Sequence, residues 1–516
     1  MSVKAPYFED EAAAAKAGFT THHGEHDHGA GTGLIKPGYD PRLANEDLAP
    51  LAEQNWTWYN IFAFWMSDVH SVGGYITAGS LFALGLTSWQ VFVCLITGIT
   101  IVLFFCNLVA KPSQRTGVPY PVICRSVFGV LGANIPAIIR GLIAVAWYGI
   151  QTYLASASLD ILLVRMFPGL QPYADVTQHG VLGLSTLGYF TFATLWVAQA
   201  AVFWTGMNTI RKFIDFAGPA VYVVMVALCV YLLTKAHWSV NLNLADHELS
   251  GAKVVTTMLA ATALVVSYFS GPMLNFGDFS RYGKTFKAVK KGNFWGLPVN
   301  FLFFSLLTVL TAAATLPVYG KLITDPVETV GHIDNTFALV LAALTFTTAT
   351  IGINIVANFV SPAFDFSNVS PQKISWRTGG MIAAVGSVVL TPWNLYNNPE
   401  TIHYTLDTLG AFIGPLFGVL IAHYYVVHRQ RVCIDDLFTL DEAGAYHYRG
   451  GYNPAAIYAT ALAALCALSS VFLPGINRLD DYSWFIGCGV AFAAYSLIAP
   501  RLGVNDRVLD TKTCVK

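Results

Sequence analysis

The sequence has few charged residues and almost no net charge. Only 11% of its 516 residues are Asp, Glu, Lys or Arg, against roughly 25% in an ordinary soluble domain. The formal net charge is −1, so the charge balance gives no reason to expect a nucleic-acid partner. Hydrophobic residues make up 55% of the chain. This combination excludes an ordinary soluble domain and predicts an integral membrane protein.

The sequence also lacks the short motifs of common enzyme classes. Neither GxGxxG nor GxxxxGK[ST] occurs, and there is no metal-ligand cluster or nucleophile–base motif, so nothing supports an enzyme. The eight cysteines form no CxxC pair, and most lie in apolar runs: Cys94, Cys106, Cys124, Cys229, Cys466 and Cys488. We expect small buried residues, not a disulfide framework or a zinc site.

The first 50 residues are polar and acidic, without a charged n-region and a short apolar core, so we expect no cleavable signal peptide. Their segment THHGEHDHG brings four histidines together: His22, His23, His26 and His28. One interpretation is a metal-binding or pH-sensing tract, and the other is a solvated tail.

Apolar runs of about 20 residues, the length of helix that crosses a bilayer core, recur along the chain. We count twelve, centred near residues 70, 98, 145, 193, 225, 263, 308, 348, 388, 416, 463 and 490. The predicted fold class is therefore an all-α integral membrane protein with twelve transmembrane helices.

Basic residues gather in alternate loops, after the second, fourth, sixth, eighth and tenth spans. They are Lys111, Arg115, Arg125, Arg211, Lys212, Arg281, Lys284, Lys287, Lys290, Lys291, Lys373, Arg377, His428, Arg429 and Arg431. The intervening loops, such as residues 391–403 and 474–482, hold few. Basic loops of membrane proteins face the cytoplasm, so we predict a multi-pass plasma-membrane protein with both termini in the cytoplasm.

Two spans contain residues that interrupt a helix. The first, FWMSDVHSVGGYITAG, has Gly73 and Gly74, and the sixth, SYFSGPMLNFGD, has Gly271 and Pro272. Spans five apart run in opposite directions, so a five-helix repeat would be inverted the second time. Broken helices at matching positions of inverted repeats point to the binding site of a transporter.

This pattern divides the chain into five parts. They are a polar N-terminal tail (1–50), a first five-helix repeat (51–240), an inverted second repeat (241–430), a linker with two extra helices (431–500) and a C-terminal tail (501–516).

Two spans place polar side chains on one helix face. In GLIAVAWYGIQTYLAS, Trp147 and Gln151 are four residues apart. An indole offers a stacking surface and an amide offers one acceptor and two donors, which suits a flat polar ring. The alternative is that Gln151 bonds to another helix and Trp147 only packs.

The eighth span, TTATIGINIVANFV, places Asn354 and Asn358 four residues apart. Buried amides need partners, so this pair contacts either another helix or a substrate. In the sixth span, Tyr268 and Phe269 precede the break and Asn275 follows it.

Several segments together resemble one known family. They are NWTWYNIF before the first span, then WYGIQTYL, LNFGDFSRY, VANFVSPAFDFSNVSPQKISWRTGG and GAFIGPLFGVLIAHYYVV. In this order, over about residues 45–475, they are similar to the nucleobase-cation-symport-1 family, which includes hydantoin, allantoin, uracil and cytosine permeases. The resemblance implies the leucine-transporter-like fold, with two inverted repeats of five helices and two extra helices.

The resemblance also implies substrate-binding residues. The family's stacking tryptophan and amide on the third helix correspond to Trp147 and Gln151, and its eighth-helix amide corresponds to Asn358. The amide position of the first helix corresponds to Ser71.

The sixth helix departs from the family pattern. The position of a second tryptophan in the hydantoin permease is Phe269 here, preceded by Tyr268, where a backbone contact is expected. The smaller ring leaves the exact substrate open.

The coupling-ion site departs further. In the sodium-coupled member of the family, the ion lies between first-helix carbonyls, an eighth-helix alanine carbonyl and Ser and Thr hydroxyls. The eighth-helix positions here are Ala349, Gly352 and Ile353, so both hydroxyl ligands are missing. We group Ser67 of the first span with these positions. Sodium needs several hard oxygen ligands, as calcium and magnesium do, so we expect the site to hold it poorly.

Titratable groups in the first span then become candidates for ion coupling. An Asp or His inside the bilayer is costly, and proton transfer is one role that retains such a residue. We hypothesise that Asp68 or His70 carries a proton in symport. The alternative is that each pairs with another buried polar group or only packs.

The sequence thus predicts a secondary transporter, not an enzyme. It would import a small planar nitrogen heterocycle by proton symport with alternating access, and a uracil-type ring is favoured. The nearest alternative is an allantoin or hydantoin permease, sodium-coupled or uncoupled, and a non-transporting membrane receptor is the alternative of another class. The expected partners are the heterocycle, the coupling ion and membrane lipid, with no cofactor besides the coupling cation.

Overall fold

The structure is a computed structural model that describes residues 3–4, 30, 33–70, 74, 81, 84–242, 244, 249–323, 326–333, 335–395, 399–504 and 514. Helices dominate it. The strands of this described part are two short antiparallel pairs, β1 (Val3–Lys4) with β2 (Glu53–Gln54) and β3 (Gly180–Val181) with β4 (Leu184–Ser185).

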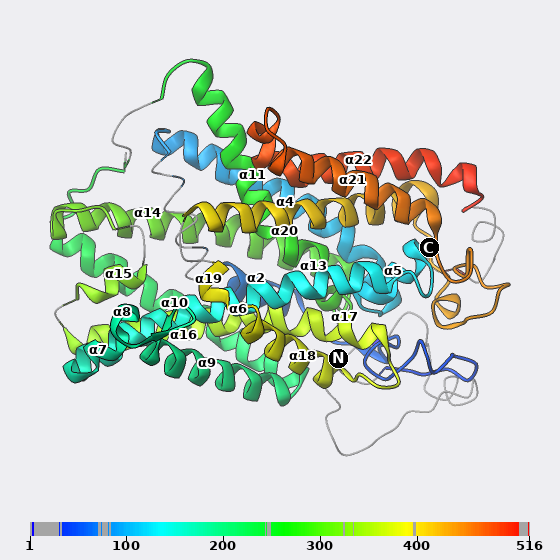
Figure 1. Ribbon diagram of the computed structural model, residues 1–516, viewed down its shortest axis with the longest axis horizontal. Helices are drawn as coiled ribbons and strands as arrows, with labels where there is room; N and C mark the ends of the chain where they lie inside the picture. Colours follow the sequence, from blue (N-terminus) through cyan, green and yellow to red (C-terminus); the bar gives the residue numbers. More distant parts are fainter. Residues whose placement is uncertain are drawn as a thin grey trace.

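The long helices lie side by side along the long axis of the molecule (Figure 1). They are α4 (Ser88–Thr116), α6 (Asn134–Met166), α9 (Thr186–Trp204), α10 (Met207–Lys235), α11 (Ala252–Leu274), α14 (Asn300–Tyr319), α16 (Thr336–Ile353), α20 (Pro399–Ile421), α21 (Pro454–Phe472) and α22 (Ser483–Ile498). Shorter helices connect them: α5 (Tyr120–Phe128), α7 (Gln171–Ala174), α8 (Val176–His179), α12 (Gly277–Ser280), α13 (Phe286–Phe294), α15 (Pro326–Gly331), α17 (Ser361–Val369) and α19 (Pro392–Leu395).

Within the described residues, ten helical segments are long and apolar enough to cross a membrane. Each contains one of the predicted span centres. The other two centres, residues 70 and 388, fall at the end of α2 (Trp58–Val69) and within α18 (Trp376–Val389), which are shorter. The predicted all-α membrane fold is confirmed, whereas the number of twelve crossings stays a prediction.

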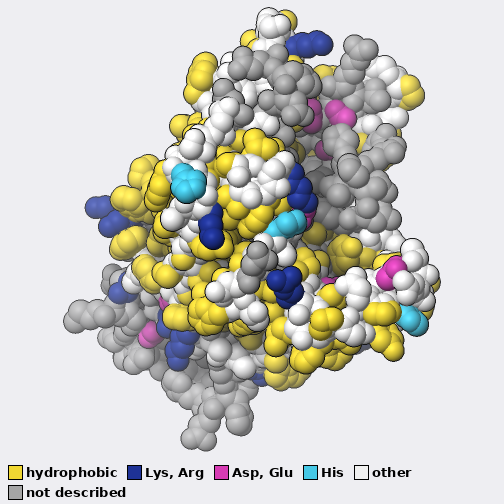
Figure 2. Space-filling view, turned by 90° about the vertical axis from the view of Figure 1, so that its left-hand side faces the viewer, with side chains coloured by type: hydrophobic (Ala, Val, Ile, Leu, Met, Phe, Trp, Pro, Cys, Tyr) yellow, Lys and Arg dark blue, Asp and Glu magenta, His cyan; other side chains and the backbone are white. Residues whose placement is uncertain are grey.

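Large apolar side chains cover the outside of these helices. Phe104 of α4 is 60% exposed, Phe216 of α10 is 75% exposed and Phe337 of α16 is 76% exposed. Soluble monomers rarely expose large apolar patches, and such a surface suits a lipid environment. Hydrophobic side chains also cover much of the end that holds α7 and α15, where Figure 2 shows scattered basic side chains and histidines among them.

The opposite end carries residues 33–57 and the linker after α20 (Figure 1, right). We call it the inner end, because the basic loops predicted to face the cytoplasm lie there, and we call the α7 and α15 end the outer end. The linker after α20 contacts the N-terminal segment at two places. Lys36 forms an ion pair with Asp435 at 2.7 Å, and the Tyr39 ring stacks on Phe438 with 4.5 Å between ring centroids.

The chain before α2 is fastened to the chain after α12. Gln54 Nε2 donates to the carbonyl oxygens of Gln114 at 2.6 Å and Arg281 at 2.7 Å. The backbone of Trp56 pairs with residues 282–284. The Arg281 guanidinium donates in turn to the carbonyls of Asp47 and Ala49. The first broken helix therefore begins beside the end of the second.

Asp47 connects this N-terminal segment to α18. Its carboxylate accepts from the N–H groups of Ala30 at 3.2 Å and Trp376 at 3.0 Å. Burial raises the pKa of the Asp47 carboxyl, and the two N–H donors and the Arg281 guanidinium partly offset that shift.

The first break is predicted at Gly73 and Gly74, and residue 73 lies outside the described residues; α2 ends before it, at Val69. The second break differs from its predicted position. α11 runs through Gly271 and Pro272 to Leu274, so the break predicted at this pair is wrong by about three residues. A proline removes one hydrogen bond and its ring crowds the carbonyl four residues before it, but its φ is helical, and here the helix continues past it. The chain leaves the helix at residues 275–276, before α12.

The eighth span contains a local irregularity. α16 passes at residue 354 into a π-helical segment, η3 (Asn354–Val360), which continues into α17. Wide turns of this kind are rare, and they occur often at functional sites because they redirect the side chains that follow. Asn358 lies in this segment.

Cys433 and Cys514 form a disulfide, which corrects, for this pair, the expectation of small buried residues without a disulfide framework. The residues lie 81 positions apart, and such a spacing alone does not reveal pairing. The other six cysteines are free, and four of them are buried, as their apolar surroundings predicted.

Candidate functional site

A central cavity of about 40 Å³ lies between α2, α6, α11 and η3. Its lining comes from four stretches far apart in the sequence: Asp68, Arg140, Trp147, Gln151, Ser267, Tyr268, Ser270, Gly271, Pro272, Ile353, Ala357 and Asn358. Six of these were candidate site residues in the sequence: Asp68, Trp147, Gln151, Tyr268, Ile353 and Asn358. The structure therefore brings half of the twelve predicted site residues together in one cavity.

Aromatic rings form one side of this cavity. Trp147 and Tyr268 meet edge to face, with 6.4 Å between centroids and planes at 81°. Phe269 does not line the cavity and is 1% exposed. It packs instead on Trp65 and Phe301. Adjacent residues on a helix point about 100° apart, so only one of this pair can face the cavity, and it is Tyr268.

The side-chain amides of Asn354 and Asn358 make different contacts. Asn354 Nδ2 donates to the Tyr148 carbonyl at 3.1 Å and to Thr152 Oγ1 at 2.9 Å, which joins η3 to α6. Asn358 Nδ2 donates to Asn354 Oδ1 at 3.0 Å and lines the cavity. The contact with another helix is confirmed for Asn354, whereas the substrate contact stays a prediction for Asn358. Gln151 is 1% exposed, and its Oε1 has no hydrogen-bond partner among the described residues.

Asp68 and His70 face different parts of the molecule. Asp68 lines the central cavity, and its Oδ1 accepts no hydrogen bond from the described residues. Its charged neighbour is Arg140. The His70 ring lies between Tyr222 of α10, with centroids 4.0 Å apart, and Phe304 of α14, at 5.3 Å. Only Asp68 is therefore in reach of a molecule in the cavity.

The positions of the family's sodium ligands lie where α2 meets α16. A Cβ added to Gly352 would lie 3.4 Å from Cβ and 3.6 Å from Oγ of Ser67. Ser67 Oγ has no hydrogen-bond partner in the described part of the chain. Ile353 lines the cavity and Ala349 is buried. Ser71, the first-helix candidate for substrate contact, lies outside the described residues.

Sequence reasoning missed Arg140, which is 1% exposed and lines the cavity. Its Nη2 donates to the Ala357 carbonyl at 3.3 Å, whereas Nε and Nη1 have no partner among the described residues. The signal was present as an arginine inside the third span, because a charge in a membrane helix is a functional candidate by default.

Two further carboxylates lie near Arg140, toward the inner end. Asn275 Nδ2 donates to Asp278 Oδ2 at 3.2 Å and to Asp365 Oδ2 at 3.3 Å, and the Tyr120 N–H donates to Asp278 Oδ1. Both carboxylates interact electrostatically with Arg140. Asn275, which the sequence placed after the break, thus joins buried carboxylates and does not line the cavity.

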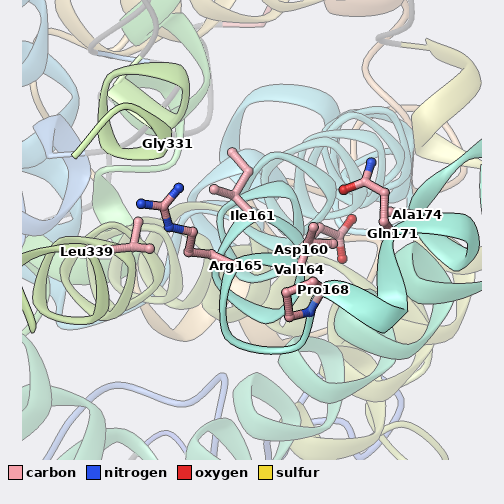
Figure 3. A pocket seen from close by; sticks show the side chains of 9 residues that line it. All are labelled: Asp160, Ile161, Val164, Arg165, Pro168, Gln171, Ala174, Gly331 and Leu339. Atoms are coloured by element: carbon pink, nitrogen blue, oxygen red, sulfur yellow. The ribbon is translucent and has the colours of Figure 1, made fainter. Parts of the chain in front are cut away.

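A second, outer cavity of about 400 Å³ lies at the other end of α6 (Figure 3). It is lined by Asp160, Ile161, Val164, Arg165, Pro168, Gln171, Ala174, Gly331 and Leu339. Asp160 Oδ1 accepts a hydrogen bond from Thr191 at 2.7 Å. In Figure 3 the Arg165 side chain extends toward Gly331 and Leu339, away from Asp160 and Gln171. The sequence did not indicate this cavity.

Known sequences resemble nearly the whole chain. The family model for permeases for cytosine/purines, uracil, thiamine and allantoin matches residues 49–487. The allantoin permease of Bacillus subtilis is 33% identical over 467 residues, which cover 89% of this chain and 93% of that one. The purine-uracil permease of Arabidopsis thaliana is 30% identical over 490 residues, which cover 92% of this chain and 81% of that one.

Solved structures share the architecture. A nucleobase-cation-symport-1 family transporter, in a closed conformation with bromovinylhydantoin bound, matches with a TM-score of 0.72 and 22% identity over 89% of this chain and 96% of that one. A Na+-coupled sialic acid symporter matches with a TM-score of 0.60 and 11% identity, over 87% and 90% of the two chains. The transporter fold implied by the sequence resemblance is therefore confirmed.

Proposed function

The chain belongs to the nucleobase-cation-symport-1 family of permeases for cytosine and purines, uracil, thiamine and allantoin, and from this membership we propose that it imports a small planar nitrogen heterocycle by proton symport. It is a membrane transporter and not an enzyme. One observation carries the choice of substrate class: Trp147, Gln151 and Asn358 line a single cavity in the middle of the helix bundle.

The cavity lining suits a flat ring with polar edges. The ring stacks on the Trp147 indole, and Tyr268 closes the side of the stack. Gln151 and Asn358 offer donors and acceptors to ring N–H and C=O groups. Stacking of a base on an aromatic side chain contributes about 1–3 kcal/mol, and each neutral hydrogen bond contributes about 1 kcal/mol. The stack therefore supplies the largest single contribution to binding.

Proton coupling rests on Asp68. It is the cavity-lining member of the Asp68 and His70 pair, and the hydroxyl ligands of a sodium site are absent at Gly352 and Ile353. Protonation of Asp68 removes a charge that is costly at a buried position. We propose that Asp68 takes up a proton together with the substrate, and that alternating access around the two broken helices carries both across the membrane.

Two rings are candidates for the substrate. A uracil-type ring follows from the sequence resemblance and from the similarity to the purine-uracil permease. The allantoin permease of Bacillus subtilis, at 33% identity, supports allantoin as the second candidate.

Uptake of radiolabelled uracil and allantoin, with unlabelled hydantoin, cytosine and purines as competitors, tests the proposal. We expect Trp147→Ala to weaken binding of the transported ring by about 10- to 100-fold, because it removes the stacking surface. The matched control is Trp89→Ala, since Trp89 lies on α4 and is 64% exposed; it should leave uptake unchanged. Normal uptake by Trp147→Ala would show that the ring binds elsewhere.

A further inference from the structure

Asp365 is a buried carboxylate with little to stabilise its charge. It lies on α17 and is 0% exposed, and its Oδ2 accepts one hydrogen bond, from Asn275 Nδ2 at 3.3 Å. Its Oδ1 accepts none from the described residues. A buried charge with too few hydrogen bonds is strongly disfavoured. The Asp365 carboxyl group is therefore short of donors, and a bound proton removes the charge that needs them.

The neighbouring carboxylate, Asp278, has more donors. Its Oδ1 accepts from the Tyr120 N–H at 2.8 Å, and its Oδ2 accepts from Asn275 Nδ2 at 3.2 Å. The Arg281 guanidinium also stabilises its charge. One amide thus bridges both carboxylates, and two like charges in one buried site do not both ionise readily. The difference in donors makes Asp278 the ionised member of the pair and Asp365 the protonated one.

The total charge of this buried region supports one bound proton. The titratable groups that interact with the pair, directly or through an arginine, are Asp68 of α2, Tyr120 and Cys124 of α5, Arg140 of α6, Arg281 after α12 and Asp47 of the N-terminal segment. The tyrosine and the cysteine are neutral at neutral pH. With the pair itself, four carboxylates then face two guanidinium groups. A proton on Asp365 reduces the surplus of negative charge from two to one.

Arg140 couples the pair to the central cavity. Its guanidinium interacts electrostatically with Asp365, Asp278 and Asp68. It forms no ion pair within 4.0 Å with any of them in the described part of the chain, so its charge is not committed to one carboxylate. An ionised Asp68 opposes ionisation of Asp365, because both carry the same charge and share this guanidinium. Protonation of Asp68 removes that opposition, and Asp365 then holds its proton less tightly.

We propose that Asp365 is a second proton-binding site, which releases its proton toward the inner end when Asp68 takes one up with the substrate. One proton joins the Asp68 carboxylate and one leaves the Asp365 carboxyl group, so the charge of the buried region does not change. When the substrate leaves, the proton of Asp68 passes to Asp365, and one proton has crossed with each substrate. The inference rests on the proposed function for the proton that Asp68 takes up, and it adds the inner site.

Infrared spectroscopy of the purified, full-length protein without substrate tests the site itself. A protonated carboxyl group has a C=O stretching band that a carboxylate lacks. At neutral pH we expect Asp365→Asn to remove one such band. Asp68→Asn should weaken the same band, because an amide imitates the neutral state of Asp68 and so favours loss of the proton from Asp365. A merely structural role of Asp365 would not give a band that depends on Asp68.

Asp47→Asn is the matched control for the infrared measurement. Asp47 is also a buried carboxylate, but each of its oxygens accepts a backbone N–H. Its replacement should therefore leave the band unchanged. If Asp365→Asn does not fold, Asp278→Asn takes its place. Without the neighbouring charge Asp365 ionises, and the same band should disappear.

Calorimetry in buffers of different ionisation enthalpy counts the protons exchanged when a ring binds, with uracil and allantoin as the probes. At neutral pH the unaltered protein should exchange about zero protons per bound ring, because uptake by Asp68 and release by Asp365 cancel. Asp365→Asn should take up about one proton per bound ring, because only the uptake remains.

Two results would overturn the second site. One is that no infrared band depends on Asp365, and the other is that the unaltered protein and Asp365→Asn both take up about one proton per bound ring. In either case, ring uptake and its dependence on Trp147 and Asp68 persist. If the ring binds and neither protein takes up a proton, the proposed proton uptake by Asp68 fails, and the exchange with Asp365 fails with it.

Discussion

The central and outer cavities offer the same types of polar side chain and share two helices in their walls. The central cavity offers Asp68, Arg140 and Gln151, and the outer cavity offers Asp160, Arg165 and Gln171. α6 and α16 border both. The outer cavity is about ten times larger, at about 400 Å³ against about 40 Å³. By size alone the outer cavity would be taken as the binding site.

The burial of the polar side chains favours the central cavity instead. Arg165 and Gln171 are exposed, and Asp160 is partly buried and bonded to Thr191. Water can serve such groups when no ligand is present, so a ligand gains little by replacing it. Among the described residues, the central cavity instead holds buried donors and acceptors without partners, which a ligand would satisfy at a larger gain. Unpaired buried polar atoms therefore favour the central cavity for the site that we propose, although it is the smaller of the two.

The largest expected difference between the cavities concerns the two aspartates. Asp68→Asn should abolish accumulation of substrate driven by a proton gradient, because an amide cannot take up the proton. Asp160→Asn should retain most of it. Uptake into proteoliposomes with and without an imposed pH gradient, at constant sodium, measures both. If Asp68→Asn still accumulates substrate at the normal level when a proton gradient is imposed, a group other than Asp68 carries the proton.

The two glutamines sharpen the comparison at a smaller scale. Gln151→Ala should weaken binding of the heterocycle by about 5- to 10-fold, the loss of one neutral hydrogen bond. Gln171→Ala should change it less than twofold, because water already serves an exposed amide. Equilibrium binding to the two purified variants gives the numbers. Equal effects of the two changes would mean that burial does not distinguish the cavities.

The smallest expected effect tests the missing sodium ligands. Gly352→Ser together with Ile353→Thr restores the two hydroxyls where α16 meets Ser67, and the Gly352 position has ordinary van der Waals space for a Cβ. Sodium should then tighten substrate binding by a few-fold, as expected for modest coupling between two sites. Gly352→Ala is the control without a hydroxyl, and titration of sodium at fixed pH is the measurement. If sodium does not tighten substrate binding in the double variant, the sodium site does not lie at residues 352 and 353.

Features that depend only on residues close together in the sequence could be predicted from it. Trp147 and Gln151 face one cavity because their spacing of four follows from helix geometry alone, and the span centres follow from the length of apolar runs. The break in the sixth span lies about three residues after its predicted position because Pro272 tolerates a helical φ, so composition located this break only to within a turn. His70 shows a similar limit, since only packing decides which neighbour a side chain two residues from Asp68 meets.

Relations between distant segments were not predictable from one sequence. That Tyr268 and not Phe269 faces the cavity depends on the rotation of α11 against its neighbours. Among the described residues, Nε and Nη1 of Arg140 have no partner, while the hydrogen bonds of the nearby Asp278 and Asp365 come from Asn275 and the Tyr120 backbone. Arg140 itself was visible as a charge in a span, but its importance emerges only when the carboxylates around it have been placed.

The fastening of Gln54 and Trp56 to residues 281–284 has a mechanical consequence. These contacts join parts of the chain more than 200 positions apart. The start of α2 and the end of α12 are therefore held together by hydrogen bonds. A displacement of one of these helix ends relative to the other would therefore break hydrogen bonds that join them.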